Sequence, residues 1–227
     1  MQSYLENIYI IPILVFSVVI HEIAHAWVAL KCGDTTARDL GRITLNPIPH
    51  IDLVGSILVP LFSILATGRV FIAWAKPVPI DPRNFSNFKR DDTLVTIAGP
   101  LSNLIIAFIC SAMVVVIYFI TNALNTPSVG LLNEFTGYLL KMFYAGIILN
   151  VSLAVFNLLP IPPLDGSHIL ANILPDEIAE RYRSIGFMGI FIIIGLFNFA
   201  PGFSKFFISI IQFVASPYLN IVHYFLN

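Results

Sequence analysis

The pattern His-Glu-x-x-His lies near the N-terminus, inside the apolar run VFSVVIHEIAHAWVAL. His21 and His25 are four residues apart, so on a helix they lie on one face, one turn apart, where both imidazoles can bind a single zinc ion. Glu22 would lie beside such an ion and could accept a proton from its bound water. Neighbouring helices could instead simply satisfy these polar groups. A glutamate in an apolar helix costs several kcal/mol unless it is paired or functional, which favours a metal site.

Two imidazoles require a third protein ligand, since a catalytic zinc keeps its fourth position open for water. The candidates are the other polar groups in or beside apolar segments, namely Asp165, His168, His50 and Glu134. Asp165 is favoured because it follows the prolines that interrupt a helix in FNLLPIPPLDGSHIL. Irregular backbone at membrane depth is tolerated mainly where it lines a protein cavity. For His50 and His168 the alternative is a membrane-edge histidine with no metal role.

The elements that position these groups are long apolar segments. A transmembrane helix needs about 20 mostly apolar residues. Four segments meet this length, at residues 8–30, 93–120, 138–160 and 205–226. Two shorter segments, residues 53–67 and 186–200, either span or enter and leave on one side. The expected fold is an all-α polytopic integral membrane protein with five or six transmembrane helices.

The composition supports this class of protein. Hydrophobic residues make up 57% of the 227 residues and charged residues only 11%, whereas a soluble domain carries about 25% charged residues. So few charges exclude a soluble enzyme, a nucleic-acid binder and a disordered chain. No linker or repeat divides the sequence. We therefore expect one membrane domain over residues 1–227, with a core at about 8–170 and C-terminal helices at about 186–226.

Together, HEIAH in one apolar helix and NLLPIPPLDG far downstream resemble the site-2 proteases, which are intramembrane zinc metallopeptidases. The intervening AGPLSN and LGRITLNPIPHID resemble the short bacterial branch without appended domains. Position by position, the resemblance implies that His21, His25 and Asp165 bind one zinc ion and that Glu22 is the catalytic base. It also implies that Asn157 lies near the substrate, and that the protein belongs to a bacterial cytoplasmic membrane.

Charge gives a separate prediction of topology. His25 lies near the end of its helix and Asp165 just past the end of another, so the two helices must run in the same direction for the residues to meet. They do so if residues 53–67 re-enter rather than span. Ten of the twelve basic residues then lie on one side, all except Lys141 and Lys205, against seven and five with a full span. Because Lys and Arg favour the cytoplasmic side, we expect a re-entrant or surface segment at 53–67 and a zinc site toward the cytoplasm.

The predicted function is hydrolysis of peptide bonds in membrane-spanning or membrane-associated proteins by a zinc-activated water. The partners are then an unidentified membrane-protein substrate and the lipid bilayer, with no nucleic acid. A membrane zinc transporter is one alternative, although its ligands would be spread along a path through several helices. Another is a different HExxH membrane peptidase with a downstream glutamate as third ligand, but Glu134, Glu177 and Glu180 are poorly placed for that role.

Overall fold

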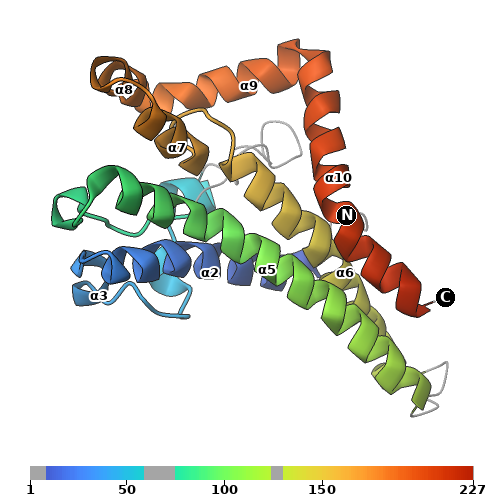
Figure 1. Cartoon of the computed structure of the whole chain (residues 1–227). Coiled ribbons are helices and arrows are strands. Elements are labelled where there is room, and N and C mark those ends of the chain that lie inside the picture. The colour runs from blue at the N-terminus through green and yellow to red at the C-terminus, as the bar shows by residue number, and fades with distance from the viewer. Residues whose placement is uncertain (1–8, 59–74, 124–129, 227) are drawn as a thin grey trace. The chain divides into compact units, whose positions relative to one another are not determined.

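Long apolar helices make up most of the chain (Figure 1). The computed structural model describes residues 9–58, 75–123 and 130–226, and within these ranges it contains helices and no strand. Among the described residues, four helices are long and apolar enough to cross a membrane: α2 (Ile10–Lys31), α5 (Phe88–Ala123), α6 (Leu131–Asn157) and α10 (Pro201–Leu226). Each covers most of one of the four long segments predicted from the sequence, so the all-α polytopic fold is confirmed.

Helix α5 begins before its apolar run because polar side chains cap its first turn. Asn87 Oδ1 accepts the Arg90 N–H at 3.2 Å, and Asp91 Oδ2 accepts the Asn87 N–H at 2.8 Å. This reciprocal arrangement satisfies amide groups that have no partner within the helix. The helix therefore starts five residues earlier than hydropathy alone predicts.

The shorter apolar segment near the C-terminus forms part of a bent pair of helices. Helix α8 (Asp176–Arg183) and the stretch from η4 (Gly186–Met188) through α9 (Gly189–Phe199) differ in direction by 69°. Counted as one span, this pair raises the number of candidate spans among the described residues from four to five. The predicted re-entrant segment at 53–67 lies outside the described residues beyond η2 (Leu53–Leu58).

Two compact units make up the chain, the first formed by residues 18–99. Its core packs Ala26 of α2 against Ala37 and Val78. Gly33 ends α2 with φ of +107°, and a Cβ there would lie 2.9 Å from the Asn84 carbonyl oxygen, so only glycine lets the two backbone segments approach. Among the described residues, the short helices of this unit are α3 (Thr36–Asp39), η1 (Ile48–His50), η2 and η3 (Pro82–Asn84).

Residues 1–17 and 100–227 form the second unit, in which small residues let α5, α6 and α10 pack closely. Ala107, Val151 and Ala215 form its core, one from each helix. Asn103 Nδ2 donates to Asn150 Oδ1 at 3.0 Å, and both side chains are fully buried. This hydrogen bond joins α5 to α6 within the apolar region.

The proline-rich turn in this unit ends α6 and starts α7 (Asp165–Ile173). At two glycines, other backbone segments lie directly against the backbone of this region, with no room for a side chain between them. A Cβ on Gly166 would overlap the Leu158 carbonyl, and one on Gly189 would overlap the Pro162 carbonyl. The predicted helix break is confirmed, and Asp165 becomes the first residue of a new helix.

Candidate metal centre

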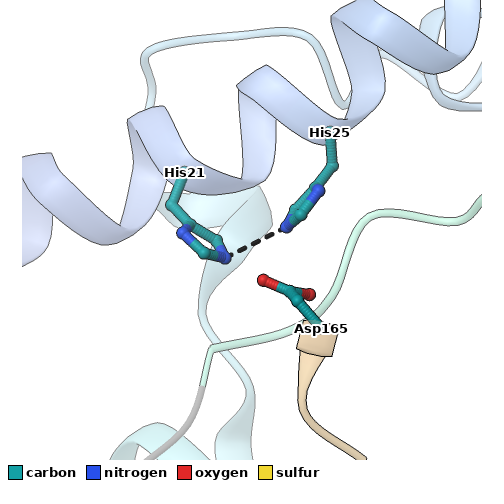
Figure 2. Close-up of side chains that lie close together, drawn as sticks. All are labelled: His21, His25 and Asp165. Carbon is teal, nitrogen blue, oxygen red and sulfur yellow. Dashed lines mark hydrogen bonds between the residues drawn. The ribbon is translucent and has the colours of Figure 1, made fainter. Parts of the chain in front are cut away.

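The two histidines of α2 direct their rings toward each other across one helical turn (Figure 2). Their Nε2 atoms are 3.0 Å apart, and the side chains are only 8% and 7% exposed. Two nitrogens bound to one tetrahedral zinc, each at about 2.0–2.1 Å, are roughly 3.3 Å apart. The pair His21 and His25 therefore needs only a small shift to bind one ion.

A backbone carbonyl sets the tautomer of His25. Its Nδ1 lies 2.7 Å from the Val95 oxygen of α5. Since a carbonyl oxygen can only accept, Nδ1 carries the proton in this contact and the lone pair of the neutral ring is on Nε2. This is the outer hydrogen bond that metal-binding histidines usually make, and it directs Nε2 to the candidate site.

Gly99 lets α5 lie directly against the imidazoles. A Cβ at this position would overlap His25 Nε2 and would lie 2.6 Å from His21 Cε1. Any other residue would displace a ring that has to bind the ion. The glycine of the AGPLSN motif is therefore part of the construction of the site.

The half-buried Glu22 directs one carboxylate oxygen at a backbone amide. Its Oε2 accepts the Val78 N–H at 2.8 Å. This bond fixes the orientation of the carboxylate, which α2 carries one residue after His21. A carboxylate fixed beside a candidate metal site can serve as a proton acceptor.

The carboxylate of Asp165 lies at the start of α7, directly after the proline-rich turn (Figure 2). His21 and His25 belong to the unit of residues 18–99 and Asp165 to the other unit, and each offers a ligand atom that zinc accepts. Two nitrogens and one oxygen match the ligand type of catalytic zinc sites with an open fourth position.

The remaining sequence candidates lie outside this group. His50 is buried, with Nε2 3.1 Å from the Thr44 oxygen, whereas His168 and Glu134 are exposed. Asn157 is half-buried as the last residue of α6, eight residues before Asp165.

Sequence reasoning missed three contributors to the site, namely the Val95 carbonyl, the Val78 amide and Gly99. The first two act through backbone atoms, so their side chains give no signal. Only Gly99 could have been noticed in the sequence, because it is a glycine followed by a proline inside an apolar helix.

Comparison with known proteins assigns the chain to a family. The model of peptidase family M50 matches residues 81–198. YwhC of Bacillus subtilis, provisionally named a zinc metalloprotease, is 40% identical over 190 residues, which cover 81% of this chain and 80% of YwhC. Rip2 of Mycolicibacterium smegmatis, named in the same way, is 27% identical over 199 residues, covering 86% of this chain and 68% of Rip2. No solved structure matches the chain significantly. The resemblance found in the sequence is thus confirmed: the chain belongs to peptidase family M50.

Proposed function

We propose that this integral membrane protein is an intramembrane zinc metalloprotease that hydrolyses peptide bonds of membrane-spanning or membrane-associated proteins. Its membership of peptidase family M50 and its apolar helices support this assignment. The observation that carries it is the buried pair His21 and His25, whose Nε2 atoms face each other beside Glu22. Zinc is the cofactor, and His21, His25 and Asp165 are its proposed ligands.

Each residue then has a defined task. When bound, zinc activates a water molecule for attack and polarises the carbonyl of the peptide bond to be cleaved. Glu22 accepts the proton of the attacking water and returns it to the leaving amine. Asn157 orients the substrate through its amide. The Val95 carbonyl keeps the proton of His25 on Nδ1 and leaves Nε2 for the ion.

A Glu22→Gln variant tests this assignment. The variant is expected to keep about one zinc per chain, because Glu22 is not a ligand, and to lose cleavage of a membrane-tethered test substrate. The matched control is Glu134→Gln, which changes an exposed glutamate in the first turn of α6. Cleavage by Glu22→Gln at the wild-type rate would contradict the role of Glu22 as base.

The ligand assignment has its own test. Asp165→Ala is expected to lower bound zinc sharply, while Asp176→Ala, at the exposed start of α8, leaves it unchanged. Full zinc content in Asp165→Ala would rule out Asp165 as a ligand. Membrane proteomics of cells with wild-type or Glu22→Gln enzyme would then identify substrates, which accumulate only with the variant.

We further propose that residues 1–227 act as one catalytic domain in a bacterial cytoplasmic membrane, with the zinc site toward the cytoplasm. The distribution of Lys and Arg supports this orientation. Single cysteines at Leu40 and Asn87, both exposed and placed in a chain without its native cysteines, test it. Both are expected to react with a membrane-impermeant reagent from the cytoplasmic side, and reaction from opposite sides would contradict a re-entrant segment at 53–67.

A further inference from the structure

Residues 75–81 have no regular secondary structure and belong to the unit formed by residues 18–99, and we call them the strap. Pro77 and Pro79 have no N–H, so few strap amides can donate hydrogen bonds. The Lys76 N–H donates to the His50 carbonyl at 2.9 Å, and the Val78 N–H donates to Glu22 Oε2 at 2.8 Å. The strap is therefore attached to the proposed catalytic base by one backbone hydrogen bond.

Arg42 binds the carbonyl oxygens of the strap. Its Nη2 donates to the Lys76 carbonyl at 2.8 Å and to the Pro77 carbonyl at 3.2 Å, and only 8% of the residue is exposed. In the described part of the chain its buried Nε has no hydrogen-bond partner. Burying a guanidinium with an unsatisfied N–H is costly, so a gain in stability is a poor explanation for this residue.

The far end of the strap is fixed by Asp34. This fully buried carboxylate accepts the Asp81 N–H at 2.8 Å, and its other oxygen accepts Asn84 Nδ2 at 2.8 Å. Between the two ends, the Val78 side chain packs against Ala26 and Ala37. The strap is thus held before and after the amide that reaches Glu22, and little freedom remains for that amide.

We propose that Arg42 is a positioning residue for the base: by holding the Lys76 and Pro77 carbonyls, it presents the Val78 N–H to Glu22 Oε2 and leaves Oε1 to take the proton. The proposal rests on the proposed role of Glu22. A proton acceptor held in one orientation meets the attacking water in the geometry that proton transfer requires, without a search over rotamers. The same contact could have the opposite effect and block catalysis. In that case the Val78 N–H would have to release Glu22 before the carboxylate could accept a proton.

Val78→Pro separates these readings, because it removes the N–H, and Val78→Ala is the matched control, because it loses side-chain packing and keeps the N–H. If the strap positions the base, kcat of Val78→Pro falls about 10- to 100-fold below that of Val78→Ala, with KM and zinc content unchanged. Equal kcat values for the two variants would overturn the proposal. A higher kcat for Val78→Pro would overturn it too, in favour of the block.

Arg42 provides a second test that leaves the strap sequence intact. Arg42→Gln is expected to lower kcat about tenfold at constant KM and zinc content, and Arg42→Lys to recover part of the loss, because an ammonium group still donates to carbonyls. Arg38→Gln is the matched control, since Arg38 is exposed and pairs only with the adjacent Asp39 among the described ion pairs. Wild-type kcat in Arg42→Gln, or loss of zinc in proportion to activity, would overturn the positioning role.

Glu22→Gln in the same assay separates failure of this inference from failure of the proposed function. If Glu22→Gln is inactive and Val78→Pro matches Val78→Ala, the strap inference alone fails. If Glu22→Gln remains active, the base assignment fails, and the strap inference fails with it.

Discussion

Two buried histidines of the same unit present opposite nitrogens to the backbone. His25 uses Nδ1 to reach the Val95 carbonyl at 2.7 Å and directs Nε2 at His21. His50 uses Nε2 to reach the Thr44 carbonyl at 3.1 Å, and its buried Nδ1 has no hydrogen-bond partner in the described part of the chain. His50 is also the more deeply buried, at 2% exposure against 7%.

Burial alone therefore does not distinguish a metal ligand from a structural histidine. What distinguishes them is the second ring nitrogen and what it faces. His25 directs its second nitrogen, Nε2, at another imidazole one turn away, whereas no group of three ligand side chains among the described residues includes His50. His50 instead helps to fix the loop that carries it, and its carbonyl accepts a hydrogen bond from the strap.

Replacing each histidine by alanine tests most directly whether one is a metal ligand and the other structural. His25→Ala is expected to lose bound zinc and at least about a thousandfold in kcat/KM, because a metal site with one fewer ligand loses several kcal/mol of transition-state stabilisation. His50→Ala is expected to keep its zinc and to lose thermal stability instead. Metal analysis with a cleavage assay on both proteins checks this, and zinc loss in His50→Ala would remove the distinction.

The next largest effect is expected at the glycine beside the histidines. Gly99→Ala would place a methyl group against His25 Nε2 and His21 Cε1. Disturbing the surroundings of metal ligands typically costs 10- to 100-fold in metal affinity, so zinc affinity is expected to fall by about that factor.

Gly137→Ala is the matched control for this change, because a Cβ at that position in α6 would meet nothing within 4 Å. This control is expected to raise stability by up to about 1 kcal/mol, because alanine is the better helix former. Zinc affinity, titrated with a competing chelator, is the measurement. Equal affinities in the two variants would show that the rings can move away from the methyl group at no cost.

Asp34, which holds the end of the strap, gives a smaller, pH-dependent effect on stability. Burial acts to raise the pKa of Asp34, but hydrogen bonds from Thr36, Asn84 and Asp81 outweigh it and hold the pKa below its usual range. A depressed native pKa stabilises the fold above the unfolded value of about 3.9, and this contribution is lost as pH falls through the native value. Asp34→Asn is thus expected to lower the free energy of unfolding by about 1–3 kcal/mol at pH 7.

The same reasoning predicts that the difference between wild type and Asp34→Asn shrinks as pH falls below about 4. Thermal unfolding in detergent at pH 7 and at pH 3 measures it. Asp39→Asn is the control, because Asp39 is exposed and is held by the adjacent Arg38 and by Thr35. A difference that stays constant with pH would show that the charge of Asp34 does not contribute.

The spans and the proposed ligands could be predicted from the sequence because both depend on the types of residue present and on their spacing over short stretches of chain. Hydropathy marks α2, α5, α6 and α10, and the spacing of His21 and His25 fixes a helix face. The supports of these residues could not be predicted in the same way. Arg42 looked like one of ten basic residues that set topology, yet it is buried against backbone carbonyls 34 and 35 residues further along the chain. Such contacts depend on how the loop closes, which no local pattern records.

The smallest expected effect concerns Asn103 and Asn150, which are as polar and as buried as the histidines but lie in the other unit. Asn103→Ala removes the donor to Asn150 Oδ1, while Asn150 Nδ2 keeps its bond to the Gly146 carbonyl at 2.9 Å. Hydrogen bonds between membrane helices average about 0.6 kcal/mol, so the variant is expected to lose about 1 kcal/mol or less of stability. Its zinc content and kcat are expected to stay at wild-type values. A fall in kcat without a fall in stability would instead give Asn103 a role in catalysis, and buried polarity in the spans would then mark function as well as packing.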